Sequence, residues 1–157
     1  MTTRKILVPV DYSEGSRDAL RFAARVARGN TAVLDVIHVW DRPAYVPEGV
    51  AVHHPDGETR SLVEMIRENA EREMDEFVAG AELPSDLGVE RRVLSGNPAS
   101  RILSELSSGI YELVVVGTHG RTGFRHLLLG SVAETLVRRS PVPVLTVPHA
   151  SRRERPE

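Results

Sequence analysis

Residues 113–120 read Leu-Val-Val-Val-Gly-Thr-His-Gly. The four apolar residues predict a strand that is buried on both faces, as the central strands of parallel sheets are. A glycine-containing loop follows, and Gly130 and Ser131 then stand at the start of a predicted helix over residues 131–139. A strand, a loop and a helix in this order form the unit from which parallel α/β sheets are built.

The same alternation continues outward from this stretch toward both ends of the chain. Helical spacing of apolar residues predicts three more helices, which begin after Ser13 as N-cap, at residue 58 and at Asn97-Pro98. Between them, apolar runs predict four more strands, at residues 6–10, 32–39, 89–94 and 142–147.

Three features refine this pattern. The charges inside strand 89–94 and the proline at Pro143 predict that the strands containing them are sheet edges. Residues 40–57 hold several prolines and glycines and are predicted to form a long loop. Residues 149–157 are polar and are expected to be a disordered tail.

The fold class follows from this order of elements. We predict one α/β domain over residues 1–148, a doubly wound five-stranded parallel sheet with helices on both faces. Such sheets bind ligands at the carboxyl ends of their strands, where the strand order reverses.

Composition excludes several classes of function. The 157 residues include 20 basic and 22 acidic ones, a net charge of −2, which argues against a dedicated nucleic-acid binder. The chain has no cysteine, which excludes thiol catalysis and cysteine-based metal sites. Lys5 is the single lysine, so chemistry that needs a lysine has almost no candidate. No run of 18 apolar residues and no signal peptide are found, so we expect a cytoplasmic protein with no membrane segment.

The segment after strand 113–116 is the best candidate for chemistry. Gly117 and Gly120 let the backbone approach a ligand, and Gly130-Ser131 would place the N–H groups of a helix start beside an anion. A phosphate group is the expected ligand. The alternative needs no ligand, because Ser131 and Glu134 together also match a capping box. The spacing is neither that of a P-loop nor that of a dinucleotide fingerprint.

These residues resemble a known family. Gly117-x-x-Gly120, nine residues and Gly130-Ser131 is similar to the nucleotide motif of the universal stress protein family, in its ATP-binding branch. Three further segments resemble that family's strands: 6–13, His38-Val39 and 141–147. The resemblance reaches from the start of the chain to about residue 148 and implies a strand order of 3-2-1-4-5.

The resemblance also implies roles for individual residues. Pro9, Val10 and Asp11 would line the adenine and ribose side, and the backbone of Val39 would read the adenine. Val116 and Gly117 would flank the ribose and the first phosphate. The phosphates would be held by Gly120, Gly130, Ser131 and Val132, and Mg²⁺, if present, would sit mainly on phosphate oxygens.

The other candidate binding residues each have an alternative interpretation that needs no ligand. Asp11 can instead serve as a carboxylate at a helix start. His119, Arg121 and Arg125 lie between the halves of the motif and could contact phosphate or could be solvated.

Two further histidine features favour no ligand. His38 is expected to be structural. His53-His54 with Asp56 hints at a metal site, but no third ligand with suitable spacing is evident, so we predict no metal there. No catalytic triad or pair can be assigned.

The leading functional hypothesis is an ATP-dependent regulatory switch or sensor in stress response. A slow ATP hydrolase and an interaction scaffold that needs no nucleotide are the alternatives, and we expect at most a weak ATPase. We further predict a homodimer built on the last strand through Val142, Val144, Leu145 and Val147, since an apolar sheet edge is avoided in monomers. The regulatory partner protein is not indicated by the sequence.

Overall fold

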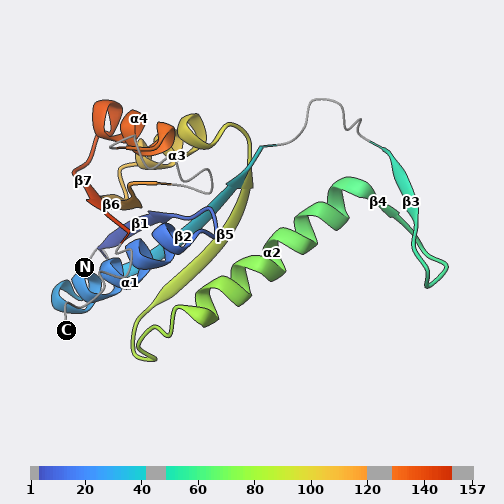
Figure 1. The fold of residues 1–157 in the computed structure, drawn as a ribbon, viewed down its shortest axis with the longest axis horizontal. Coiled ribbons are helices and arrows are strands. Elements are labelled where there is room, and N and C mark those ends of the chain that lie inside the picture. The colour runs from blue at the N-terminus through green and yellow to red at the C-terminus, as the bar shows by residue number, and fades with distance from the viewer. Residues whose placement is uncertain (1–3, 42–48, 120–128, 150–157) are drawn as a thin grey trace, which may run out of the picture.

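Five strands form the central sheet of this protein (Figure 1). The computed structural model describes residues 4–41, 49–119 and 129–149. The strands are β1 Lys5–Pro9, β2 Val33–Trp40, β5 Val89–Ser95, β6 Tyr111–Gly117 and β7 Val144–Val147, with β3 Ala51–His53 and β4 Thr59–Ser61 in a separate hairpin. The helices are α1 Glu14–Asn30, α2 Leu62–Gly80, α3 Pro98–Leu106 and α4 Ser131–Arg139.

The sheet has the strand order β5-β2-β1-β6-β7, and every neighbouring pair in it is parallel. When the hairpin strands β3 and β4 are left out of the numbering, this is the predicted order 3-2-1-4-5. The strand order reverses between β1 and β6, because the chain builds outward from β1 in one direction and then in the other. Both strands predicted as edges, β5 and β7, are edges.

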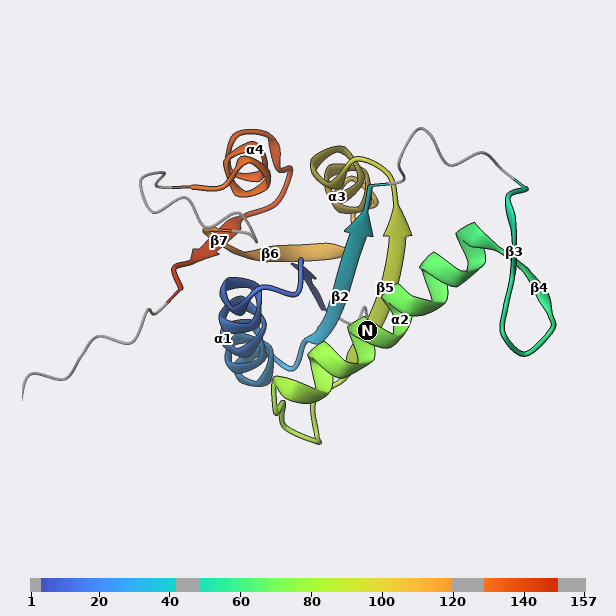
Figure 2. The ribbon, with the colours of Figure 1, turned by 45° about the vertical axis from the view of Figure 1, so that its right-hand side comes forward.

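Helices cover both faces of the sheet (Figure 2). On one face, Ala19 and Leu20 of α1 and Met74 and Phe77 of α2 pack in one buried cluster. On the other, α3 and α4 contribute Ile102, Leu106, Ala133 and Leu136 to a second cluster. Among the described residues, no helix is both long and apolar enough to cross a bilayer.

Local sequence signals set the helix starts. The Ser13 hydroxyl accepts a hydrogen bond from the Ser16 N–H at 3.2 Å and caps α1. The Asn97 side chain accepts one from the Ser100 N–H at 3.1 Å and caps α3, with Pro98 in the first turn.

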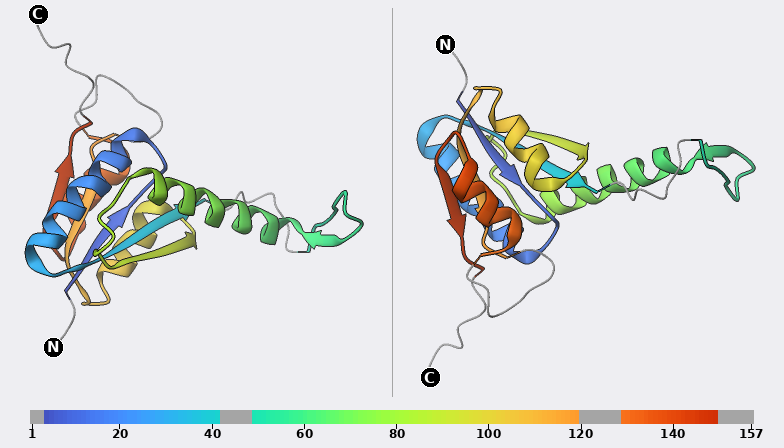
Figure 3. Two further views of the ribbon diagram at one scale, coloured as in Figure 1. Left: turned by 90° about the horizontal axis from the view of Figure 1, so that it is seen from below. Right: turned by 90° about the horizontal axis from the view of Figure 1, so that it is seen from above.

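The largest departure from prediction lies between β2 and α2. Residues 51–61 form an antiparallel hairpin in which Val52 pairs with Arg60, so the predicted loop 40–57 and the predicted helix start at residue 58 are both wrong there. Its turn uses Gly57 at φ +89°, a conformation that favours glycine. Strands of three residues are too short to show an alternating pattern. The hairpin and the first half of α2 project beyond β5 (Figure 3).

The last strand is also shorter than predicted, because β7 begins at Val144 and not at Val142. Pro143 has no N–H to donate, but its carbonyl oxygen still accepts from the Val114 N–H at 3.1 Å.

A buried carboxylate, Asp35, joins β2 to its surroundings, and nothing in the sequence predicted it. Asp35 is 1% exposed, and the Arg92 Nη2 donates to its Oδ2 at 2.7 Å. The Tyr111 hydroxyl also donates to Asp35, and Glu105 lies 2.9 Å from the same Arg92 nitrogen. The hydrogen bond to Asp35 raises the pKa of Arg92, and burial followed by the hydrogen bond to Asp35 raises the pKa of Tyr111.

Candidate functional site

A cavity forms at the carboxyl end of the sheet because β1 stops before its neighbours do. The pairing of β1 with β2 ends at Pro9 and Ile37, whereas β2 continues beside β5 as far as Trp40. On its other side β1 last pairs with β6 at Val114, and β6 continues beside β7 to Gly117. The gap beyond the end of β1 is therefore the point where the strand order reverses.

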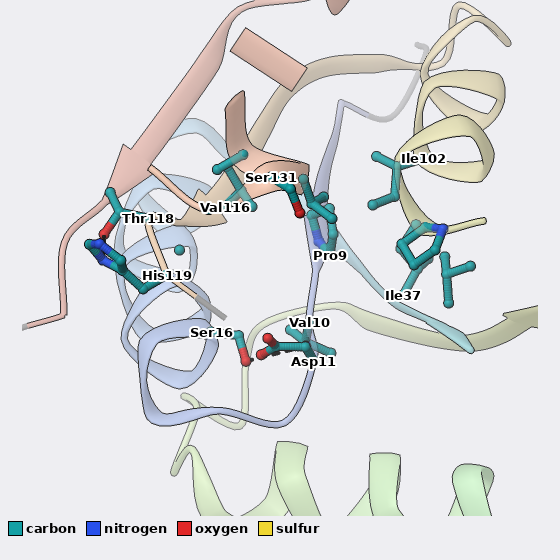
Figure 4. A pocket seen from close by; sticks show the side chains of 16 residues that line it. Pro9, Val10, Asp11, Ser16, Ile37, Ile102, Val116, Thr118, His119 and Ser131 are labelled. Carbon is teal, nitrogen blue, oxygen red and sulfur yellow. Dashed lines mark hydrogen bonds between the residues drawn. The ribbon is translucent and has the colours of Figure 1, made fainter. Parts of the chain in front are cut away.

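The cavity has a volume of about 280 Å³ (Figure 4). Ten of the twelve residues predicted for the site line it: Pro9, Val10, Asp11, Val39, Val116, Gly117, His119, Gly130, Ser131 and Val132. The other two, Gly120 and Arg121, lie outside the described residues, as does Arg125.

The two sides of the cavity differ in polarity. Figure 4 shows Ile37 and Ile102 on one side and Thr118 and His119 on the opposite side. The cavity is also lined by residues that the sequence did not indicate: Ser16, Ile37, Pro98, Ile102, Thr118 and Ala133. The N-cap at Asn97 was the available signal for the α3 residues, since it places the start of that helix at the carboxyl end of the sheet.

Asp11 takes part both in the cavity and in the start of α1. Its Oδ1 accepts from the Ser13 N–H at 3.0 Å and also from the Ser13 hydroxyl. The Asp11 N–H in turn donates to the Ser16 Oγ at 3.4 Å. The structure thus assigns Asp11 the helix-start role weighed from the sequence, and also places it at the wall of the cavity.

Three helix N-termini border the cavity, and α4 differs from the other two. Ser16 of α1 and Pro98 of α3 line the cavity, but those helices are capped by Ser13 and Asn97. For α4 the N-cap is Gly130, and no side chain in the described part of the chain caps it. The helix dipole and open N–H groups make such an end attractive to an anion.

This geometry corrects one prediction. A capping box needs the serine at the N-cap, but Ser131 is the first helical residue of α4. Its partner in that prediction, Glu134, instead lies 2.9 Å from Arg138 in an ion pair one turn along. The capping box predicted for Ser131 and Glu134 is therefore wrong.

Thr118 connects three elements at the polar side. Its N–H donates to the Val147 carbonyl oxygen at 3.1 Å, and its own carbonyl oxygen accepts from the Gly130 N–H. Its hydroxyl lies 2.9 Å from the His119 Nδ1. The buried Thr118 thereby holds the end of β6 against β7 and the start of α4.

His38 does not line the cavity but contacts Val10, which does. Its Nδ1 lies 2.8 Å from the Val10 carbonyl oxygen, and its ring stacks on Tyr12 with centroids 4.2 Å apart. The Tyr12 hydroxyl donates to the Ala70 carbonyl oxygen in α2 at 2.9 Å. These contacts give His38 the structural role that we expected.

The two adjacent histidines of the hairpin have different partners. His53 Nδ1 lies 3.0 Å from the Thr59 hydroxyl, and His54 Nδ1 lies 2.8 Å from Asp56. Within the described residues, no group of three histidine, aspartate or glutamate side chains could hold a metal ion.

Comparison with known proteins points to one family. The model of the "Universal stress protein family" matches residues 2–148. Universal stress protein MJ0531 of Methanocaldococcus jannaschii is 30% identical over 144 residues, which cover 92% of this chain and 81% of that protein.

Two solved structures share the fold and carry adenine nucleotides. A universal stress protein in complex with cAMP superposes with a TM-score of 0.59 at 23% identity and covers 94% of this chain and 98% of its own. The universal stress protein from Archaeoglobus fulgidus in complex with dAMP gives a TM-score of 0.59 at 19% identity, with 94% and 99% covered.

Proposed function

The chain belongs to the universal stress protein family, and from this premise we propose that it binds ATP in the cavity beyond the end of β1. The observation that carries the proposal is the start of α4. It is the one N-terminus, of the three described at the cavity, that no described side chain caps. Phosphate would take the place of the missing cap.

The polarity of the cavity supports one orientation of the nucleotide. Phosphates at Gly130 and Ser131 leave the base to the apolar side formed by Ile37 and Ile102. On that side β2 runs past the end of β1, so the backbone near Val39 faces the cavity and not a β1 partner. The ribose then lies over Pro9, Val10 and Asp11, in agreement with the family resemblance.

The neighbours with bound cAMP and dAMP support an adenine nucleotide as the ligand class. We propose more specifically that the nucleotide is a triphosphate. This rests on the spacing of Gly117, Gly120, Gly130 and Ser131. Mg²⁺ would accompany ATP on its phosphate oxygens.

We propose a regulatory role for this binding, in the cytoplasm and in stress response. A bound nucleotide would itself become part of the surface at the carboxyl end of the sheet, between the end of β6 and the start of α4, and a partner protein could distinguish the occupied state from the empty one. We also propose that the protein forms a homodimer in which a second copy of the chain binds at the β7 edge.

Two measurements test nucleotide binding. Mass spectrometry of the small molecule that copurifies with the protein is expected to find an adenine nucleotide. Calorimetry on the emptied protein is expected to give saturable binding of ATP and weaker binding of GTP. Equal affinity for the two nucleotides, or no binding of either, would contradict the proposal.

A further inference from the structure

The cluster around Asp35 also joins α3 to the sheet. The Arg92 Nη2 of β5 donates to the Asp35 Oδ2 of β2 at 2.7 Å and to the Glu105 Oε2 of α3 at 2.9 Å. The Asp35 side chain is 2% exposed and that of Glu105 is 17% exposed, so both carboxylates are largely removed from water. Asp35, Arg92 and Tyr111 belong to strands, so Glu105 is the point at which this cluster holds a helix.

This bridge between β2 and α3 lies beside the apolar end of the cavity. Asp35 and Ile37 are alternate residues of β2, so they face the same side of the sheet about 6.6 Å apart. Ile102 and Glu105 are three residues apart in α3 and lie on the same side of the helix. Ile37 and Ile102 line the cavity, and both belong to one buried cluster. The span from Asp35 through Arg92 to Glu105 therefore sets how far apart these two elements lie next to the cavity.

The other contacts of α3 determine its position less closely. Just before its start, the Gly96 N–H donates to the Trp40 carbonyl oxygen at 3.0 Å, which ties that end to β2. Of its nine residues, Ile102 and Leu106 are the buried ones. Apolar contacts are not directional and resist a small rotation of the helix weakly. A charge-assisted hydrogen bond is directional, so Glu105 supplies what the apolar contacts lack.

Stability alone is a poor explanation for this cluster. Two carboxylates and a guanidinium lose hydration when they are buried, and their mutual attraction offsets much of that cost but adds little beyond it. The best-attested use of such a buried ionic contact is to fix the register of one element on another. Here the elements whose register is fixed are β2 and α3, which both carry residues of the cavity wall.

We propose that Arg92 and Glu105 are positioning residues of the nucleotide site, which hold α3 where the cavity prefers adenine to guanine. This inference rests on the proposed function. Neither residue lines the cavity, so both act through Ile102. Adenine and guanine differ mainly in the polar groups at their edges, so discrimination needs that edge to meet the backbone near Val39 in a fixed position. The apolar side against which the base rests sets that position.

The test is calorimetry with ATP and with GTP on the full chain and its variants. Glu105→Ala removes the hold on α3 but leaves Arg92 paired with Asp35, so no buried carboxylate loses its partner. We expect its ATP affinity to fall about threefold to tenfold and its preference for ATP over GTP to shrink at least about threefold. Glu105→Gln keeps an acceptor without the charge and should lie between Glu105→Ala and wild type.

Arg101→Ala is the matched control on the same helix. It removes the other ion pair of Glu105, at 3.2 Å, from a side chain that is 43% exposed, and it leaves the contact with Arg92. We expect its affinities for both nucleotides to stay within about twofold of wild type. Urea unfolding should show that every variant is folded at the temperature of the titration. A merely structural role of Glu105 would lower both affinities by one factor and leave their ratio unchanged.

The outcomes separate this inference from the proposed function. A wild type that prefers ATP, with the same preference in Glu105→Ala, would overturn the positioning role alone. Equal losses in Glu105→Ala and Arg101→Ala would also overturn it, because any weakening of α3 would then suffice. A wild type that binds neither nucleotide would contradict the proposed function, and this inference with it.

Discussion

Gly117 packs against Gly15 with no room for a side chain on either. A Cβ on Gly117 would lie 2.9 Å from the Gly15 carbonyl oxygen, and a Cβ on Gly15 would lie 2.9 Å from the His119 carbonyl oxygen. The end of β6 and the first turn of α1 thus touch backbone to backbone. The sequence motif explains Gly117 by approach to a ligand, whereas the structure shows that packing against α1 already requires glycine there.

Gly117→Ala should therefore destabilise the fold even without nucleotide. Backbone atoms cannot rotate away from the added methyl group, so we expect a loss of about 1–3 kcal/mol in the free energy of unfolding. Urea unfolding measures this. The control is Gly29→Ala, where a Cβ in α1 meets nothing within 4 Å and should stabilise by about 0.5–1 kcal/mol. Equal stability of Gly117→Ala and wild type would refute the packing argument.

Substitution of Gly130, at the start of α4, can change nucleotide affinity without lowering the stability of the fold. Gly130 has φ −69° and ψ 161°, which other residues adopt, so Gly130→Asp would supply the missing cap. The carboxylate would occupy the N–H groups and repel phosphate. We expect ATP affinity to fall at least about tenfold while the unfolding free energy stays equal or rises by about a few tenths of a kcal/mol.

Two further substitutions at this position serve as controls for that calorimetric experiment. Gly130→Ala adds a Cβ without a cap and should still bind ATP. Gly130→Asn adds the cap without the charge and should fall between the alanine and aspartate variants. Undiminished ATP binding by Gly130→Asp would place the phosphates elsewhere.

These features differ in how far the sequence could predict them. The cap residues Ser13 and Asn97 and the strand before Gly117 are local signals that predict where helices and a strand begin or end, and the family resemblance was needed to indicate most of the ten predicted residues that line the cavity. The partners of Asp35 could not be predicted in this way, because Arg92 and Tyr111 lie 57 and 76 residues away. The need for glycine at Gly15 is equally non-local, since it arises only when α1 lies on β6.

The Asp35 cluster makes stability depend on alkaline pH. Burial and the hydrogen bond to Asp35 raise the pKa of Tyr111, so the folded protein holds this proton more tightly than the unfolded chain. The contribution is complete below pH about 10, the ordinary pKa of tyrosine, and is lost as pH rises toward the higher pKa of the folded state. We expect the unfolding free energy to fall with pH above about 10, and less steeply in Tyr111→Phe. Parallel falls in both proteins would exclude Tyr111 as the cause.

The proposed dimer can be tested at the backbone of β7. Thr118 and Val114 bond to Val147 and Pro143, so the alternate residues Val144 and Thr146 direct their N–H groups outward. Thr146→Pro removes one outward N–H and leaves the bonds to β6. We expect light scattering at micromolar concentration to give a dimer for wild type and for the control Thr146→Val, and a monomer for Thr146→Pro. A wild-type monomer would contradict the proposal.

We expect ATP bound in the cavity to be hydrolysed slowly or not at all. Phosphoryl transfer to water needs charge neutralisation at the γ-phosphate and an oriented water. Of the described residues that line the cavity, none is lysine or arginine, and Ser131 with the backbone of α4 would hold phosphate without positioning water. Two side chains at the cavity could orient a water, His119 and Asp11. The His119 ring lies next to the Thr118 hydroxyl, and the Asp11 carboxylate accepts a hydrogen bond from the Ser13 N–H. Such a site binds ground state and transition state about equally, which gives affinity without rate.

Single-turnover measurement with ATP and magnesium checks this expectation, with His119→Ala as the variant. His149→Ala is the matched control, because that histidine pairs with Asp18 at 2.7 Å and does not line the cavity. All three proteins should retain bound ATP over many minutes. Turnover on the order of 1 s⁻¹, as in ordinary enzymes, that is lost in His119→Ala and kept in His149→Ala would make the protein an ATPase and not a switch that depends on occupancy.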